Sequence, residues 1–458
     1  MNKISTISLM LLSFIFALTG CQEEEPDAPI NINFNSSSIN INEENQEAQI
    51  GLVFSRASNQ AGNISVNIDN SNLVYGEEND FYTEPPAEGG ELILNYESGQ
   101  SEINFTIKAG SGLNIDSDEI IDFSINPTEV LQRGQNSSLT VAFSENFIAE
   151  SGTIEMTAGG AEFTEQAFVD LSKVRTNSLD KNTWDLGFST DNGFHVILNS
   201  TAQVMARPLD KTDLASVTAE DTVGFAAVMQ IGFTATPPAA AWIDVPNGDL
   251  TKTAIAPIAT TDADNKVYII KRLGEGRSWK KVKITQNGDG YTIAYANIGS
   301  NDIETSEITK SESHNFIHFD LDNGTTDFEP NKESWDFMYG TFTEKFPFGP
   351  NEIPYSFNDF IIINRHNTSA AMVMVERNTT YADFNLQQIG EVSFNNEINA
   401  IGSSWRQGGG PSSAPAVFDD RFFIVKDSQE NYYKIRFISM YDENNERGTT
   451  TFEFEILK

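Results

Sequence analysis

The 458-residue chain contains a single cysteine, Cys21, so no disulfide can form within it. Each folded unit must therefore bury a core that is stable without cross-links. Basic residues are also scarce: 29 Lys and Arg face 66 Asp and Glu, which gives a formal net charge of −37. A chain with this negative field repels phosphate backbones, so we exclude nucleic acid as a partner.

Catalytic motifs are missing as well. No H-E-x-x-H, G-x-S-x-G or G-x-x-x-x-G-K-S/T pattern occurs, and these patterns serve metal-dependent, serine-based and phosphate chemistry. Two S-x-x-K matches, at Ser178/Lys181 and Ser278/Lys281, lack the S-D-N and K-T-G elements that complete that motif. We therefore predict a binding protein and not an enzyme.

Beyond the N-terminus, no segment has a long helical period or an apolar run that could span a membrane. Apolar residues alternate with polar ones instead, as in Ile103–Ala109, Tyr432–Tyr441 and Thr449–Leu457. Asn287–Gly290 (NGDG) separates two such runs, which is typical of a hairpin. The fold class that we predict is all-β.

The N-terminus carries the signals of a secreted lipoprotein. Lys3 precedes the apolar run Ile7–Ala17, which is too short to cross a bilayer as a helix. Leu18–Cys21 (LTGC) resembles a bacterial lipobox, in which the cysteine is acylated and becomes the first mature residue. The resemblance implies attachment to the outer membrane through Cys21. Gln22–Glu25 resembles the acidic export tag of Bacteroidetes lipoproteins, which implies cell-surface exposure; a solvated tether is the alternative.

The segment 32–148 resembles a Calx-beta or similar immunoglobulin-like β-sandwich. The resemblance rests on Val74–Pro85, Gly99–Ala109 and Asp116–Ile125, where acidic loops precede strands. Some members of that family bind calcium with clustered loop carboxylates, because calcium takes about six to eight oxygen ligands. Solvated acidic loops are the alternative. The candidate calcium ligands are Glu77, Glu78, Asp80, Asp116, Asp118 and Glu119.

The rest of the chain contains an internal repeat with a spacing of about 150 residues. Trp184-Asp185 in the first copy corresponds to Trp335-Asp336 in the second. Matches in one order and at one spacing rarely arise by chance, so we predict two tandem copies of one β domain. The matched segments are 168–188 with 316–339, 195–206 with 360–375, and 267–285 with 422–439.

These repeated segments resemble the HmuY-like haem-binding lipoproteins of the Bacteroidetes. The second copy carries the resemblance best, through Trp335-Asp336, Arg421–Lys426 (RFFIVK), Lys434–Phe437 (KIRF) and Thr451–Phe454 (TFEF). The resemblance implies haem capture by two axial His or Met ligands, with a TonB-dependent outer-membrane receptor as partner. The predicted organisation is a signal peptide at 1–20, an acidic tether at 21–31, a β-sandwich at 32–148 and HmuY-like repeats at 150–308 and 312–458.

The loops in which the family places its haem ligands contain few such residues here. Glu376–Asp420 has no His, Met or Cys, and Arg207–Lys266 has only Met229. His314 and His318 are four residues apart in an expected strand, but no third metal ligand accompanies them, so we interpret them as surface histidines. The haem-ligand candidates are Met229, Tyr381, His195, Met205 and His366.

The Gly/Pro/Ser-rich loop Ser403–Pro415 takes the place of one family ligand loop, and it makes Trp405 and Arg406 candidates for ligand contact. Two functions therefore stay open. One is capture of haem or of a haem-sized ligand. The other is surface adhesion or glycan scavenging, in which aromatic loops stack on sugars or on a partner protein.

If the two repeats are separate domains, the polar segment Asn301–Ser313 is a linker open to proteases. A fragment that starts near Glu312 should then fold alone and unfold cooperatively. An insoluble fragment would mean that the two copies complete each other's sheets.

Replacing Cys21 with Ser should abolish acylation and release the protein from the membrane fraction, because no acyl chain then anchors it. Lipid labelling and fractionation measure this, and a variant that still carries the lipid label and stays in the membrane fraction contradicts the lipobox.

Changing Glu23, Glu24 and Glu25 to Ala should leave the protein acylated but protected from external protease. Unchanged digestion would show that these glutamates serve only as a solvated tether.

Overall fold

The computed structural model describes residues 29–458 apart from 43–44, 70–72, 114–118, 129, 135, 145–147, 275, 377–378, 410–412 and 443. The lipobox with Cys21 lies outside the described residues. Strands dominate the described part, which confirms the predicted all-β class, and no helix there is long and apolar enough to cross a membrane. The short helices are α1 (Phe225–Val228) and the 3₁₀ helices η2 (Gly160–Glu162), η3 (Leu214–Ser216), η4 (Ala219–Thr222), η5 (Pro237–Trp242), η6 (Leu250–Lys252), η7 (Asp262–Asp264) and η8 (Leu386–Glu391).

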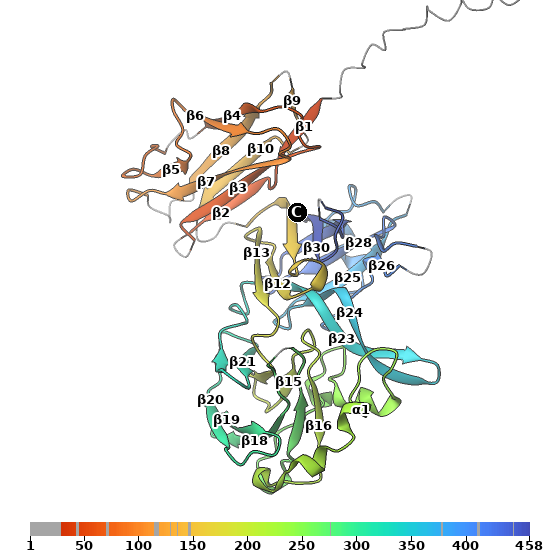
Figure 1. Ribbon diagram of the computed structural model, residues 1–458. Helices are drawn as coiled ribbons and strands as arrows, with labels where there is room; N and C mark the ends of the chain where they lie inside the picture. The colour runs from red at the N-terminus through yellow and green to blue at the C-terminus, as the bar shows by residue number, and fades with distance from the viewer. Residues whose placement is uncertain are drawn as a thin grey trace, which may run out of the picture.

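The N-terminal part is a β-sandwich of two five-stranded sheets, in the orders β5-β7-β3-β1-β9 and β2-β10-β8-β4-β6 (Figure 1). Burial alternates along its strands: in β6 the side chains of Leu92, Leu94 and Tyr96 are buried, and those between them are exposed. The strands are β1 (Ile30–Phe34), β2 (Ser38–Ile41), β3 (Glu47–Phe54), β4 (Gly62–Asp69), β5 (Phe81–Glu84), β6 (Glu91–Tyr96), β7 (Glu102–Ala109), β8 (Glu119–Asn126), β9 (Leu131–Arg133) and β10 (Ser138–Phe143).

The C-terminal part is built from two further β-sandwiches. The proximal sandwich, which meets the N-terminal part through a bridge between Ser36 and Gly152, packs sheet β11-β30-β29-β28-β25 against β13-β12-β23-β24. The distal sandwich packs β15-β14-β21-β22 against β16-β17-β18-β19-β20.

The strands of these sandwiches are β11 (Ser151–Thr157), β12 (Glu165–Asp170), β13 (Arg175–Asp180), β14 (Leu186–Ser189), β15 (Val196–Leu198), β16 (Met205–Pro208), β17 (Tyr268–Lys271), β18 (Lys280–Asn287), β19 (Gly290–Asn297), β20 (Glu304–Ile308), β21 (Phe316–Asp320), β22 (Gly324–Thr326), β23 (Phe337–Phe348), β24 (Asn351–Ile363), β25 (Ser369–Met374), β28 (Arg421–Lys426), β29 (Tyr432–Ser439) and β30 (Thr449–Ile456). A small pair, β26 (Arg406–Gln407) and β27 (Ala416–Val417), forms a separate two-stranded sheet.

The two sequence repeats exchange strands. From the first repeat, β11 pairs with β30 and β12 pairs with β23, so that Phe168 lies opposite Met338. In return, β21 of the second repeat pairs with β14 of the first, so that His318 lies opposite Gly187. The prediction that 150–308 and 312–458 each form a domain does not hold, because a cut between them divides both sandwiches.

The repeated Trp-Asp pairs hold the exchanged strands. The carboxylate of Asp185 accepts a hydrogen bond from the backbone N–H of Leu321 at 2.9 Å. In the same way, Asp336 accepts one from Leu171 at 2.7 Å. Each bond joins one repeat to the other, and we call them the first and the second joint.

The first joint is neutralised by arginines. Arg272 and Arg277 reach Oδ1 of Asp185 at 2.9 and 2.6 Å, and both guanidinium groups lie 3.8 Å from Asp320. The side chains of Arg272 and Asp185 are fully buried. Removing one partner of a buried pair costs about 3–5 kcal/mol where no other counterion remains. Because Arg272 also pairs with Asp322 at 2.6 Å, the loss of Asp185 should fall at the lower end of this range.

The second joint has no arginine at the corresponding position. Matching the repeats places Asp427 where Arg272 stands in the first copy. Asp336 therefore faces the carboxyl groups of Asp170 and Asp427. Burial, reinforced by these two groups, raises the pKa of Asp336 well above its ordinary range. Burial and like charge thus favour the protonated form of Asp336, and the nearest ion pair is that of Asp170 with Arg175 at 3.4 Å.

Two matched substitutions separate the joints. Asp185→Asn should lower the free energy of unfolding by about 3 kcal/mol, because Arg272 and Arg277 lose their buried partner. Asp336→Asn should cost far less, because an amide resembles the protonated acid and can still accept from Leu171. Chemical denaturation measures both, and equal losses would contradict the difference between the joints.

The second joint also predicts a pH dependence. The pKa of Asp336 is higher in the folded protein than in the unfolded chain. Its contribution to stability is therefore fully present below the unfolded pKa, and it is lost as pH rises through the folded pKa. Stability should therefore fall as pH rises from about 4, and Asp336→Asn should reduce that slope. A slope that is unchanged in the variant would exclude Asp336 as its source.

The fragment from Glu312 onward lacks β11, β12 and β13, so its sheets have open edges. We expect it to be insoluble or to unfold without cooperativity, and co-expression with residues 149–311 to rescue it. A soluble fragment with a cooperative transition would show that the exchanged strands are dispensable.

Candidate functional site

A groove of about 700 Å³ opens beside the exchanged strands. This volume falls within the range of about 300–1,000 Å³ that is typical of small-molecule sites. The lining is mostly polar, with Leu250 and Phe316 as apolar members. Its other residues are Ser189, Thr190, Asp191, Asn192, Glu312, His314, Asn315, Lys332, Glu333, Arg365, His366 and Asn367.

Two histidines from different segments line the groove. His366 follows β24, and its Nε2 lies 3.8 Å from a carboxylate oxygen of Glu333. His314 precedes β21, and its Nδ1 lies 3.0 Å from Oγ of Ser313. Burial and the nearby charge of Lys332 lower the pKa of His366. Its imidazole is therefore neutral near neutral pH, which is the form that binds a metal.

The other two histidines lie next to the groove. The ring of His195 lies against Gly193, in the loop that also contributes Asp191 to the groove. His318 is only 6% exposed and packs edge-on against Trp184, with ring centroids 4.4 Å apart. Burial lowers the pKa of His318 to about 3, so the ring stays neutral. The interpretation of His318 as a surface histidine is wrong, because β21 is an inner strand of its sheet.

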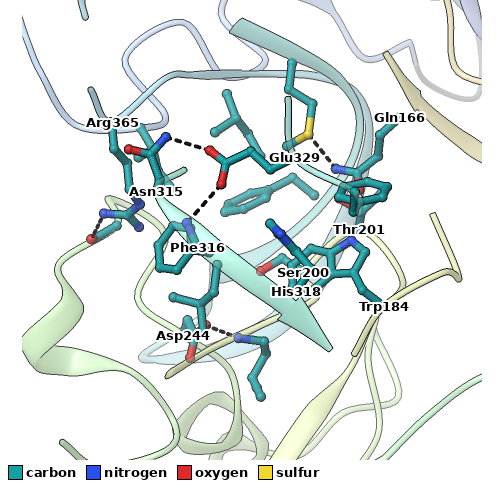
Figure 2. A pocket seen from close by; sticks show the side chains of 18 of the residues that line it. Gln166, Trp184, Ser200, Thr201, Asp244, Asn315, Phe316, His318, Glu329 and Arg365 are labelled. Atoms are coloured by element: carbon teal, nitrogen blue, oxygen red, sulfur yellow. Dashed lines mark hydrogen bonds between the residues drawn. The ribbon is translucent and has the colours of Figure 1, made fainter. Parts of the chain in front are cut away.

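An apolar cavity of about 100 Å³ adjoins the groove and shares Asn315, Phe316 and Arg365 with it (Figure 2). Both repeat tryptophans, Trp184 and Trp335, line this cavity. The groove and the cavity thus form one site with a polar outer part and an apolar inner part.

Three ionisable groups stand at the cavity wall: Glu329 is buried, and Asp244 and Arg365 are half-buried. Burial raises the pKa of Asp244 to about 6 and that of Glu329 to about 7, and it lowers the pKa of Arg365 to about 10. Glu329 accepts hydrogen bonds from Nδ2 of Asn315 at 2.6 Å and from the backbone N–H of Phe316 at 2.9 Å. Two acids thus face one base, and the wall carries no surplus positive charge.

Three of the predicted haem ligands lie elsewhere. Met205 and Met229 are fully buried in the core between the β16–β20 sheet and the short helices that follow β16. Tyr381 packs edge-on against Phe422 of β28, and its hydroxyl donates to the backbone carbonyl of Lys434 at 3.4 Å. None of the three lines the groove or the cavity, because core packing holds each of them.

The first part of the predicted ligand loop, around Trp405 and Arg406, packs against the proximal sandwich. Trp405 is 1% exposed and stacks on Phe437, with ring centroids 4.4 Å apart. Arg406 donates to the backbone carbonyls of Asn358 and Asp359. The prediction that Trp405 and Arg406 contact a ligand is wrong, because both side chains are buried against the proximal sandwich.

The structure bears on only part of the calcium prediction. Glu77 and Glu78 are exposed, and Asp80 accepts a hydrogen bond from the backbone N–H of Val74 at 2.7 Å. Among the residues that the structure describes, no group of three His, Cys, Asp or Glu is placed to hold a metal ion. The positions of Asp116 and Asp118 and the side chain of Glu119 lie outside the description, so the calcium site stays a prediction.

A family model described as HmuY protein matches residues 162–454, which is more than half of the chain. The chain therefore belongs to the HmuY family, a family of binding proteins. One model spans both sequence repeats, in agreement with the exchanged strands. A comparison with curated proteins found no match.

Solved structures of low sequence identity match both parts of the chain. Apo PinO from Porphyromonas gingivitis is 9% identical, with a TM-score of 0.22, over 68% of this chain and 98% of that chain. A Bacteroides vulgatus protein described as HmuY-like and heme binding is 10% identical, with a TM-score of 0.18, over 67% and 91%. The apo Calx CBD1 domain is 17% identical, with a TM-score of 0.22, over 26% of this chain and 100% of that domain.

Sequence reasoning named His366 and His195 as ligand candidates, but it took His314 for a surface histidine and did not single out the cavity acids Asp244 and Glu329. The sequence feature that could have pointed to His314 is the small number of histidines. The chain has only four, and each is a candidate haem ligand. No sequence signal marks the two acids, since they are two among 66.

Proposed function

We propose that this protein is a non-catalytic binding protein that captures haem in the groove, with His314 and His366 as axial ligands. The observation that carries the proposal is the groove itself. It has the volume of a small-molecule site, and two imidazoles enter it from separate segments. Imidazole is a common axial ligand of haem iron. Membership of the HmuY family, for which the resemblance implies haem capture, supports the same reading.

Charge restricts how haem lies in the groove. Lys332 is the cation of the lining that suits a propionate group, because Arg365 already faces Asp244 and Glu329. Asp191, Glu312 and Glu333 repel the propionates from the rest of the rim. We expect the apolar porphyrin edge to point toward Phe316 and the adjoining cavity.

We further propose that Cys21 anchors the protein to the outer membrane and that haem passes to a TonB-dependent receptor. The LTGC motif and the acidic residues after it support surface anchoring. A partner receptor follows from the family resemblance, because a surface lipoprotein has no passage across the membrane of its own.

Adhesion or glycan scavenging is the second candidate, and one observation favours it. The β23–β24 hairpin extends beyond its pairing with β12 (Figure 1). Phe346, Phe348 and Tyr355 of this hairpin form an aromatic cluster with Phe233. Phe233 is 62% exposed and Phe348 is 49% exposed. Exposed rings stack on sugars or proteins. Glycan binding that is lost on Phe348→Ala would support this function.

A haem titration tests the first proposal. Haem should give a sharp Soret band with the full-length protein, and His314→Ala or His366→Ala should each weaken binding at least about tenfold. The reason is that each substitution removes one iron ligand. Met229→Leu and Tyr381→Phe are matched controls, and they should bind haem as the unchanged protein does.

Two results would contradict this assignment. Full binding by the His314→Ala/His366→Ala double variant would place haem elsewhere. Loss of binding in Met229→Leu or Tyr381→Phe, with the fold intact by circular dichroism, would restore the ligands that the sequence suggested.

A further inference from the structure

Arg207 is a cation without an acidic partner in a chain that carries 66 Asp and Glu. It lies on β16, the edge strand of the β16-β17-β18-β19-β20 sheet (Figure 1). Among the residues that the structure describes, none forms an ion pair or a hydrogen bond with its guanidinium group. The side chain is half-buried, but its unpaired nitrogens are not enclosed. Its N–H groups are therefore open to a ligand from solvent.

Two aromatic rings hold this guanidinium group in place. Its central carbon lies 3.7 Å from the ring centroid of Phe225, in α1, and 4.4 Å from that of Trp242, at the end of η5. Phe225 is buried, Trp242 is half-buried, and both belong to the packing between the sheet and the short helices. A guanidinium group that is already immobilised loses little conformational entropy when it binds a ligand.

Other arginines that stack on a ring do have an acid. Arg421 lies over a phenylalanine ring and pairs with Asp420 at 2.7 Å. Arg436 lies over a tyrosine ring and pairs with Glu453 at 2.6 Å. At Arg207 burial alone lowers the pKa, and no carboxylate opposes the shift. The stacked guanidinium of Arg207 thus lacks the anion that its counterparts have.

A second cation projects from the same face of the sheet. Arg207 lies opposite Ile269 of β17. Lys271, two residues further along β17, therefore shares its face and is a diagonal neighbour of Arg207. Lys271 is 7% exposed and donates to the backbone carbonyl of Met229. Burial lowers its pKa, again without an opposing carboxylate. This edge of the distal sandwich carries positive charge that the described residues leave uncompensated.

The two cations favour a ligand with one negative charge. The planar guanidinium group offers parallel N–H donors that match the two oxygens of a carboxylate. Lys271 is buried and already bound to a carbonyl, so it acts through its field and not by contact. A phosphate dianion would bring a second charge into the field of a chain with a net charge of −37, without a second cation to contact.

We propose that Arg207, held by Phe225 and Trp242, is a binding site for the carboxylate group of a small organic acid. The carboxylate accepts two hydrogen bonds from the guanidinium group, and the charge of Lys271 adds to the attraction. Neither Arg207 nor the two rings line the groove or the apolar cavity. The site therefore goes beyond the proposed haem function and does not depend on it.

A titration of the ¹⁵N-labelled full-length protein with benzoate tests the proposal. The Nε–H signal of Arg207 and the indole N–H signal of Trp242 are the reporters, and Arg207→Lys and Trp242→Phe assign them. Both signals should shift in a saturable way, with a Kd of about 1 mM. The indole signal of Trp405 should stay in place, because its ring is buried in the proximal sandwich. Benzamide, which has the same ring without the charge, should bind at least about tenfold more weakly.

Three variants separate the guanidinium group from general charge. Arg207→Gln should weaken benzoate at least about tenfold, because it removes both the charge and the paired donors. Arg207→Lys should also weaken it, because an ammonium group keeps the charge but not the planar donors. Arg436→Gln is the matched control, since Arg436 also stacks on a ring but already has Glu453, and it should bind benzoate as the unchanged protein does. Circular dichroism checks that each variant is folded.

Four results would overturn the carboxylate site. They are reporter signals that do not move with benzoate, equal affinity for benzamide, full affinity in a folded Arg207→Lys variant, and inorganic phosphate that binds as tightly as benzoate. The His314→Ala/His366→Ala double variant should bind benzoate normally. A failure of the haem proposal is thereby distinguishable from a failure of this one.

Discussion

The C-terminal part of this protein depends on two hydrogen bonds between an aspartate side chain and a backbone N–H, each of which crosses from one repeat to the other. Asp185 accepts from Leu321, and Asp336 accepts from Leu171. Each aspartate follows a tryptophan. One short motif therefore holds an exchanged strand through its aspartate and lines the adjacent cavity with its tryptophan. Because the exchange is reciprocal, neither half has a complete core of its own. The exchanged strands therefore couple the two repeats, and we expect residues 149–458 to unfold as one cooperative unit.

The two joints meet the same requirement by different physics. In the first, Arg272 and Arg277 compensate a fully buried carboxylate. In the second, Asp427 takes the place of the arginine, and burial beside Asp170 and Asp427 raises the pKa of Asp336 and favours its uncharged form. Burial raises the pKa of Asp185 as well, but there the two arginines oppose the shift, whereas at Asp336 the neighbouring carboxyl groups add to it. The sequence repeat has thus diverged in charge while it has kept its backbone geometry.

The candidate site lies where the exchanged strands meet, and its character follows from that place. The inner face of the exchange brings Trp184 beside His318 and Trp335 beside Phe168, which makes an aromatic cavity. The outer face is formed by loops, and there His314 and His366 approach one groove. The groove and the cavity share Asn315, Phe316 and Arg365, so a ligand in the groove lies against the wall of the cavity.

The sequence by itself determined the all-β class, the repeat and the resemblance to the HmuY family. These follow from period-two alternation and from the Trp-Asp pairs, which are local patterns. It also marked His366 and His195, because histidines are scarce in this chain. Local patterns do not show which strands pair across 150 or more residues, and so the exchange of β12 and β21 was decided only by the tertiary structure. The same is true of Met205, Met229, Trp405 and Tyr381, which read as ligands in the sequence. They are core or packing residues because the sheets that surround them are assembled from distant segments.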